Sequence, residues 1–273
     1  MDREAGQHPS RQVARAAARV LEDGGLAALV TVVEGPRSVG AKLLVEESGA
    51  SAGTTGDAAL DAAVAAHAPL FLASRAEART LRAEEFAPAL EAWAGARLLF
   101  ERVEPEPRVV VCGAGHVGAS LARLARLTGY RVALIDDRAD FVKGSRFPEG
   151  GVELVVAEEG WAGAVGRAVG TGRGVYAAVV TRGHNEDEEC MRAVLTARPD
   201  YVGMIGSRRR TNIVLARLRE SGFADDVLRE VRAPVGLDIG AVTPEEVALA
   251  VLAEIVAFRR GGTGAPLSAW RRG

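Results

Sequence analysis

Val109-Val110-Val111-Cys112-Gly113-Ala114-Gly115-His116-Val117-Gly118 is the stretch of sequence that decides the fold. Four apolar residues, typical of a buried strand, lead into a Gly-x-Gly-x-x-Gly loop, after which a helical pattern begins. In such a loop Gly113 permits a tight turn, Gly115 lets a pyrophosphate approach the backbone, and Gly118 lets helix and strand pack closely. The start of the helix offers free N–H groups to an anion. The stretch therefore predicts a strand, a phosphate-binding loop and a helix.

Apolar runs and helical stretches alternate after this loop. The apolar runs are Arg108–Cys112, Arg131–Ile135, Val152–Val156, Val175–Val180 and Tyr201–Ile205. The helical stretches between them are His116–Thr128, Trp161–Val169, Asp187–Ala197 and Arg208–Ser221. Asp136–Gly151, which contains Pro148 and three glycines, is predicted to form a loop or a short helix. This alternation favours an α/β fold of the Rossmann-like type, a doubly wound parallel sheet with helices on both faces.

The first hundred residues predict a smaller N-terminal α/β domain. Its expected elements are a helix at Arg11–Leu21, strands at Leu26–Val33, Lys42–Val45 and Arg97–Val103, a glycine-rich turn at Gly49–Gly56, and a helix at Asp57–Ala66. Glu104-Pro105-Glu106-Pro107 follows, and its prolines can neither donate to a strand ladder nor continue a helix. We therefore expect an N-terminal domain of residues 1–104 and a nucleotide-binding domain of residues 105–273.

Composition narrows the class of protein. The 273 residues are 48% hydrophobic and 26% charged, with a net charge of −2, which gives no indication of a nucleic-acid partner. The longest apolar stretch, Ala58–Ala73, is broken by Asp61, His67 and Pro69, so no membrane span is predicted. Residues 1–4 lack the apolar core of a secretory signal, and the two cysteines could form at most one bridge. We expect a folded cytoplasmic protein.

A carboxylate is expected after the second strand of the sheet, about 20 residues past the loop, to receive a ribose 2′-hydroxyl. Asp136 and Asp137 stand there. One of them could serve that role while the other caps a turn or pairs with Arg138, and two solvated turn aspartates are the alternative. An acid at this position repels a 2′-phosphate, which favours NAD over NADP, although Arg138 offsets part of that preference.

Polar clusters also follow the fourth and fifth strands. Because the ligand crevice of such a sheet lies beyond the carboxyl ends of its strands, several side chains are expected to converge near Gly113. They are Arg182, His184, Asp187, Ser207 and Arg208, and His116 within the loop could join them. His184 and Asp187 could move protons or bind a metal, but two residues are not a full ligand set, and buried or capping roles are equally open. We therefore predict no metal site.

A last helix is predicted after the loop Pro234–Gly240. Thr243 is its expected cap, Pro244 its first residue and Glu246 the partner in a capping box, and the helix continues to about Arg260.

Six motifs in order make the chain similar to a known family. They are Gly113-Ala-Gly-His-Val-Gly118, Ile135-Asp-Asp-Arg138, Arg146-Phe-Pro148, Thr181-Arg-Gly-His184 with Asp187, Gly203-Met-Ile-Gly-Ser-Arg208 and Ala233-Pro-Val-Gly-Leu-Asp-Ile-Gly240. Together they resemble the XdhC/CoxI family of maturation factors for molybdenum hydroxylases such as xanthine dehydrogenase. The resemblance implies binding of the molybdenum cofactor, help with its sulfuration, and delivery to the apo-enzyme. It also implies a small N-terminal domain before a Rossmann domain, a homodimer, and a cysteine desulfurase as a further partner.

The N-terminal domain departs from the family pattern at two places. The family has a glycine triplet followed by Leu-Glu where this chain has Gly53-Thr-Thr-Gly56 and then Asp57-Ala-Ala-Leu60-Asp61. It has Cys-Gly-Gly where this chain has Ala94-Gly95-Ala96. The first change adds Cβ atoms where backbone meets a ligand, and the second removes a soft thiolate ligand. We expect an altered or lost site in this domain.

Three functions therefore stay open. The first is a molybdenum-cofactor chaperone, which rests on the motifs after Pro105. The second is an NAD-dependent oxidoreductase, which needs a catalytic acid or base, and only His184 and Asp187 are available for it. The third is a diverged nucleotide-binding scaffold that no longer carries cofactor. The sequence leaves open whether the protein is an enzyme.

Overall fold

The computed structural model describes residues 9–268, apart from the side chains of Pro9, His184 and Asn185. By their internal contacts the residues fall into two compact units, Met1–Pro105 and Glu106–Gly273. Among the described residues, no helix is both long enough and apolar enough to cross a membrane.

The N-terminal unit is built on a five-stranded antiparallel sheet in the order β3-β2-β1-β5-β4. The strands are β1 (Ala27–Glu34), β2 (Lys42–Glu46), β3 (Ser51–Thr54), β4 (Ala78–Arg82) and β5 (Arg97–Val103). The helices are α1 (Pro9–Glu22), α2 (Ala58–Ala73), α3 (Ala83–Phe86) and the 3-10 turn η1 (Glu91–Trp93). One apolar cluster joins α2 to the sheet and another joins α1 to it, so both faces of the sheet are buried.

Three sequence-based expectations for this unit were wrong or incomplete. Helix α2 continues past Pro69 to Ala73, because Phe71 and Leu72 are buried and their packing outweighs the missing proline N–H. The turn expected at Gly49–Gly56 contains strand β3. Strand β4 was not predicted, since it lies at the sheet edge with only Leu81 buried and shows no clear apolar alternation.

The C-terminal unit is built on a five-stranded parallel sheet in the order β10-β9-β6-β7-β8. The strands are β6 (Arg108–Cys112), β7 (Arg131–Asp136), β8 (Glu153–Val156), β9 (Val175–Val179) and β10 (Tyr201–Met204). Counted within the unit, this is the 3-2-1-4-5 order of a Rossmann sheet. The strands stay parallel, but the order in which they are added reverses between the first and the fourth strand. The predicted α/β fold is confirmed.

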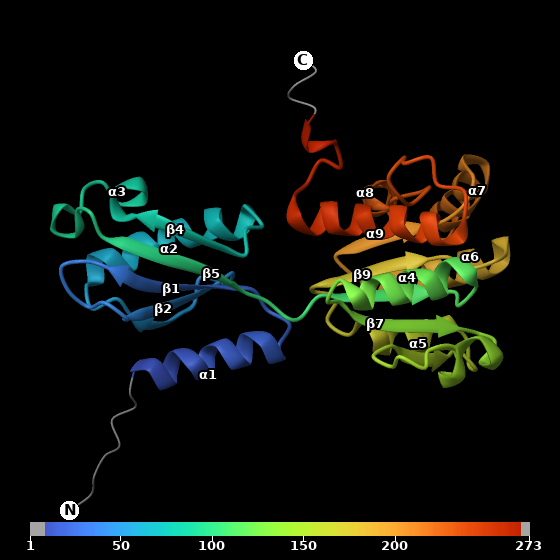
Figure 1. Ribbon diagram of the computed structural model, residues 1–273, viewed down its shortest axis with the longest axis horizontal. Helices are drawn as coiled ribbons and strands as arrows, with labels where there is room; N and C mark the ends of the chain where they lie inside the picture. The colour runs from blue at the N-terminus through green and yellow to red at the C-terminus, as the bar shows by residue number, and fades with distance from the viewer. Residues whose placement is uncertain (1–8, 269–273) are drawn as a thin grey trace, which may run out of the picture. The chain divides into compact units, whose positions relative to one another are not determined.

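Helices cover both faces of this sheet (Figure 1). They are α4 (His116–Leu127), α5 (Trp161–Val169), α6 (His184–Ala197), α7 (Arg208–Glu220), α8 (Asp225–Glu230) and α9 (Pro244–Arg260). Alternate residues of β6 explain the two layers, because Val109 and Val111 pack with α4 and α9, whereas Val110 and Cys112 pack with α5 and α6.

Local sequence signals within this unit are mostly confirmed. Asp136–Gly151 forms two 3-10 turns, η2 (Ala139–Val142) and η3 (Gly144–Arg146). Helix α9 begins with the predicted cap at Thr243, which forms a capping box with Glu246. Helix α6, however, begins three residues earlier than expected, at His184, so Asp187 lies inside its first turns rather than at its cap. Helix α8 was not predicted.

Candidate functional site

The glycine loop joins β6 to α4 at the carboxyl edge of the parallel sheet. Gly113 has a φ of +110°, and a Cβ there would lie 2.6 Å from the carbonyl oxygen of Val180. A Cβ on Gly118 would lie 1.8 Å from the carbonyl oxygen of Gly113, so the helix can approach the loop this closely only with glycine. Gly115, the N-cap of α4, has an ordinary φ of −64° and open space where a Cβ would be. Its small size keeps that space free.

A cavity of about 330 Å³ opens above this loop. It lies where the ends of β6, β7 and β9 meet the starts of α4, α5, α6, α7 and α9, so five helix N-termini surround it. Of the predicted site residues, those that line it are Gly113, Gly115, His116, Asp136, Asp137, Arg138 and Arg182. Helix N-termini carry partial positive charge, and their convergence favours an anionic ligand.

Asp136 is the acid at the end of β7, and its carboxylate is almost fully buried. Oδ2 accepts hydrogen bonds from the amide of Ala114 at 2.6 Å and from Nη2 of Arg138 at 3.1 Å. Oδ1 accepts them from the amide and Nε of Arg138, at 3.0 and 2.8 Å. Burial raises the pKa of Asp136, but these hydrogen bonds outweigh it and hold the pKa below its usual value. Asp136 is therefore the acid that pairs with Arg138.

The second acid, Asp137, takes part in a surface network at the rim of the cavity. Nη2 of Arg182 lies 3.2 Å from Oδ2 of Asp137 and 2.9 Å from Oε1 of Glu186. Nε of Arg138 lies 3.7 Å from Oδ1 of Asp137. Acids and arginines thus alternate along this rim, and each charge has an opposite neighbour. Glu186, which the sequence did not single out, lines the cavity as well.

Asp187 is neither a helix cap nor a group exposed to ligand. Its carboxylate is completely buried, accepts a short hydrogen bond from the hydroxyl of Thr181, and lies 2.5 Å from Nε of Arg210. Arg210 also donates to the carbonyl oxygen of Thr181 at 3.3 Å and lines the cavity. The cation that α7 directs to the cavity is therefore Arg210, whereas the predicted Arg208 is exposed and does not line it.

The remaining predicted residues have structural positions. Ser207 caps α7, its hydroxyl accepting from the amide of Arg210 at 3.2 Å. Gly118 serves helix packing. The backbone of His184 begins α6, but its side chain lies outside the described residues. Within the described part of the chain, no group of three His, Cys, Asp or Glu side chains is arranged to hold a metal ion.

Arg146 supports the glycine loop although it lies 32 residues from Ala114 in the sequence, a contact that local patterns do not predict. Its Nη1 donates to the carbonyl oxygens of Ala114 at 3.0 Å and of Phe141 at 2.7 Å. Trp161, at the start of α5, forms part of the cavity wall. In the sequence, Arg146 was seen only as a member of a motif and Trp161 only as the first residue of an apolar helix, so neither was predicted to belong to the site.

The glycine-rich loop of the N-terminal unit uses its polar groups internally. Asp61 accepts hydrogen bonds from the hydroxyl of Thr54 at 2.6 Å and from the amide and hydroxyl of Thr55 at 2.7 and 2.6 Å. Asp57 caps α2 and accepts from the side chains of Arg37 at 2.6 Å and Trp93 at 3.1 Å. Carboxylates at the start of α2 thus occupy the loop's donors, which an anionic ligand would need.

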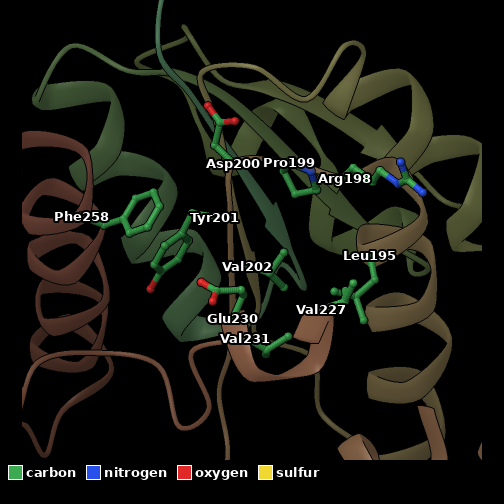
Figure 2. Close-up of a pocket in the computed structure, with 10 residues that line it drawn as sticks. All are labelled: Leu195, Arg198, Pro199, Asp200, Tyr201, Val202, Val227, Glu230, Val231 and Phe258. Carbon is green, nitrogen blue, oxygen red and sulfur yellow. The ribbon is translucent and has the colours of Figure 1, made fainter. Parts of the chain in front are cut away.

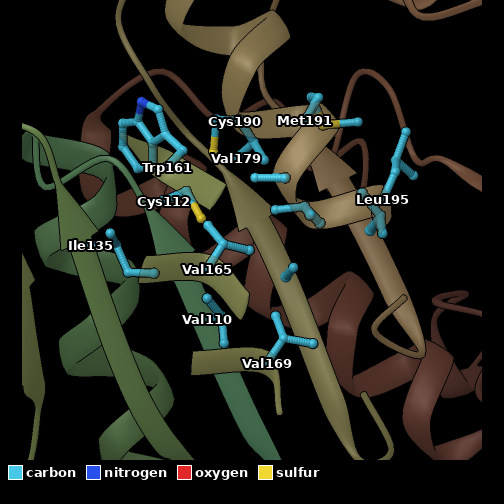
Figure 3. Close-up of a cluster of buried hydrophobic side chains, with 14 of the residues drawn as sticks. Val110, Cys112, Ile135, Trp161, Val165, Val169, Val179, Cys190, Met191 and Leu195 are labelled. Carbon is cyan, nitrogen blue, oxygen red and sulfur yellow. The ribbon is translucent and has the colours of Figure 1, made fainter. Parts of the chain in front are cut away.

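Both cysteines are free thiols buried beneath the cavity, in the cluster that joins β6 and β9 to α5 and α6 (Figure 3). Burial, followed by the neighbouring Cys112 thiol, raises the pKa of Cys190 well above its usual value. Neither thiol is accessible, so neither replaces the cysteine of the family's Cys-Gly-Gly motif as a ligand.

A second, mainly apolar cavity of about 260 Å³ lies at the opposite, amino-terminal end of β10 (Figure 2). The rings of Tyr201 and Phe258 form one wall, with centroids 5.2 Å apart, and Val227 and Val231 of the α8 region line another part. None of the predicted site residues lines it.

Two family models match the chain. Residues 109–255 match the model of the XdhC Rossmann domain, which is more than half of the chain, and residues 20–83 match that of the XdhC and CoxI family. The chain belongs to the XdhC and CoxI family. The match over residues 20–83 includes the departure at Gly53–Gly56, and Ala94–Ala96 lies beyond it.

Three relatives match parts of the chain. The chain is 34% identical over 158 residues to the uncharacterized protein YqeB of Escherichia coli, covering 58% of the chain and 28% of YqeB. It is 29% identical over 163 residues to a probable xanthine dehydrogenase subunit of Bacillus subtilis, covering 60% and 46%. It is 35% identical over 75 residues to the molybdenum cofactor insertion chaperone PaoD of Escherichia coli, covering 28% and 24%. The matches span less than half the length of each relative.

A solved structure shares the fold of this chain. The crystal structure of a xanthine dehydrogenase from Bacillus halodurans superposes with a TM-score of 0.64 over 92% of this chain and 67% of that chain, at 19% identity. At this identity the likeness shows the fold alone.

Proposed function

We propose that this protein is a chaperone for the molybdenum cofactor, assisting its sulfuration and its insertion into a xanthine dehydrogenase-type molybdenum hydroxylase. Family membership and the PaoD relative support a role in cofactor maturation. The observation that carries the proposal is the open space at Gly115, where a Cβ would meet no atom within 4 Å; we call this space the cradle. It faces a cavity with Arg138, Arg182 and Arg210 on its wall.

The cargo's phosphate is the group that this cradle suits. The N–H groups of His116, Val117 and Gly118 belong to the first turn of α4 and lack partners within the helix. A terminal phosphate or a pyrophosphate could accept hydrogen bonds from them, while Arg182 and Arg210 balance its charge. We place this binding in the Rossmann-like domain, residues 105–273.

Sulfuration needs a sulfur donor, and this chain has no accessible thiol of its own. Its two cysteines, Cys112 and Cys190, are both buried. We therefore assign the sulfur transfer to a cysteine desulfurase partner, with this protein holding the cofactor and then passing it to the apo-hydroxylase. We further propose that it acts in the cytoplasm as a homodimer.

The test uses protein purified from a host that makes molybdenum cofactor, which is denatured and assayed for released pterin, molybdenum and adenine nucleotide. Stoichiometric pterin is expected from the wild type and a loss of it from Gly115→Leu, whose side chain fills the cradle. Gly166→Leu is the matched control, because Gly166 also has open space around its Cβ position but lies on α5 outside the cavity. Equal amounts of pterin in both variants would show that the cofactor does not bind at the glycine loop.

The second candidate, a diverged scaffold that carries no cofactor, is favoured by one observation. The N-terminal glycine-rich loop is closed by Asp57 and Asp61. Wild-type protein that releases neither pterin nor nucleotide would support this alternative. The oxidoreductase alternative has less support, because Asp187 is buried and engaged by Thr181 and Arg210, so it cannot act as an acid or base toward a ligand.

A further inference from the structure

Arg138 pairs with the carboxylate that a Rossmann site normally leaves free. In sites of this type, the acid after the second strand accepts a hydrogen bond from a ribose hydroxyl of the dinucleotide. Asp136 is that acid by position, because it ends β7, the strand next to β6 and its glycine loop. Its environment nevertheless differs from what a ribose requires.

The carboxylate of Asp136 has no capacity left for a ribose. Its two oxygens offer about four acceptor positions. Ala114 uses one through its amide, and Arg138 uses three through its amide, Nε and Nη2. The neighbouring Asp137 lies beyond the end of β7 and is engaged as well, since Nη2 of Arg182 lies 3.2 Å from its Oδ2 and Nε of Arg138 lies 3.7 Å from its Oδ1. Both acids that could anchor a diol are held by arginines of the same chain.

The guanidinium of Arg138 is fixed on two sides. One edge contacts Asp136, and its plane covers the ring of Phe141, with Cζ 3.5 Å from the ring centroid. Arg146 donates to the carbonyl oxygen of Phe141 at 2.7 Å, which holds that residue in place. Arg138 still lines the cavity, so its charge reaches the ligand space.

We propose that Arg138 is a specificity residue that keeps this Rossmann site closed to NAD and to other dinucleotides that need a free carboxylate for a ribose diol. The site then admits phosphate-bearing ligands that are anchored by the glycine loop and by cations. The inference rests on the proposed use of this cavity for binding an anionic cargo, but not on which cofactor the cargo is.

Calorimetric titration with NAD tests the assignment. Wild-type protein is expected to bind NAD only weakly, with a Kd near or above about 1 mM. Arg138→Ala leaves Asp136 its two amide donors and frees the side that faced the guanidinium, so NAD affinity is expected to rise at least about tenfold. NAD lacking the 2′-hydroxyl of its adenosine ribose is expected to gain nothing, because the new contact needs that hydroxyl.

Arg208→Ala is the matched control. It removes an exposed cation at the start of α7 that does not line the cavity, and it leaves the partners of Asp136 and Asp137 in place, so NAD binding is expected to stay weak. If Arg138→Ala does not fold, Arg138→Lys keeps the charge without the two-nitrogen contact, and a gain of at least about threefold is expected. Wild-type protein that binds NAD tightly would overturn the proposal.

A folded Arg138 variant with no gain for NAD would overturn it equally. Retention of pterin by the wild type is measured separately. If the wild type retains pterin but the Arg138 variant gains no affinity for NAD, only the role of Arg138 is refuted. If the variant gains affinity for NAD but the wild type retains no pterin, only the proposed cargo is refuted.

Discussion

The carboxylate of Asp187 and the guanidinium of Arg210 join α6 to α7 beneath the cavity, with Nε of Arg210 2.5 Å from Oδ2 of Asp187. Asp187 is fully buried, whereas the side chain of Arg210 is 21% exposed. The pair is thus a buried anchor for a cation that reaches the ligand space. Thr181, just past the end of β9, completes it by donating its hydroxyl to Asp187.

Asp187→Asn is expected to destabilise the C-terminal unit by about 2–4 kcal/mol, because Arg210 loses its buried anionic partner, while the Asn oxygen can still accept from Thr181. Urea denaturation gives the free energy of unfolding. Asp225→Asn is the matched control, since its pair with Arg219 has the same 2.5 Å distance but both side chains are more than half exposed. There the expected cost is below about 1 kcal/mol. Equal costs would mean that burial does not strengthen the Asp187 contact.

Gly118→Ala is expected to destabilise the protein by about 3 kcal/mol or more, because its Cβ would overlap the carbonyl oxygen of Gly113 at 1.8 Å. Gly115→Ala, three residues earlier, is expected to change stability by less than about 1 kcal/mol, since its Cβ meets nothing within 4 Å. Thermal unfolding of the two variants checks the difference. A Gly118→Ala protein as stable as the wild type would show that the loop and helix can move apart at no cost.

Asp57 is expected to titrate at about pH 2 instead of 3.8, mainly because of the hydrogen bond from Trp93, then that from the Leu60 amide and that from Arg37. Since the pKa is lower in the folded state, ionised Asp57 stabilises the N-terminal unit at neutral pH. That contribution declines below about pH 4 and is gone once the pH has fallen past about 2. NMR titration of the Asp57 carboxyl in the wild type and in Trp93→Phe measures the shift. The variant should titrate at higher pH, and an equal midpoint in both proteins would contradict the role of Trp93.

The two thiols are expected to resist modification in the native protein, because Cys112 and Cys190 are buried and burial raises the pKa of Cys190. Labelling with a chromogenic disulfide reagent should proceed only as fast as the protein unfolds, and both thiols should react at once in denaturant. Rapid labelling of native protein would show that the cluster under the cavity opens readily, and would restore a thiol as a candidate for sulfur handling.

The sequence by itself determined the elements whose signals are local. The apolar run before Gly113, the glycine spacing and the alternation of strands and helices predicted the parallel sheet, and the sheet has the expected Rossmann order. Thr243, Pro244 and Glu246 predicted the start of α9, because a helix cap involves only neighbours three residues apart. Strand β4 was missed for the same reason, since an exposed edge strand has no strong local pattern.

Only the tertiary structure decided which side chains face a ligand. The sequence placed Asp136, Asp187 and Arg208 at the correct edge of the sheet, but not the direction or the partner of each. The start of α7 turns Arg210 rather than Arg208 toward Asp187, 23 residues away, and the turn after β7 folds Arg138 back onto Asp136. A charged side chain pairs with whatever opposite charge the packed elements bring within reach, and that distance is set by contacts between elements remote in the chain. The site's free and occupied acids therefore became known only once β6, β7, α6 and α7 were placed together.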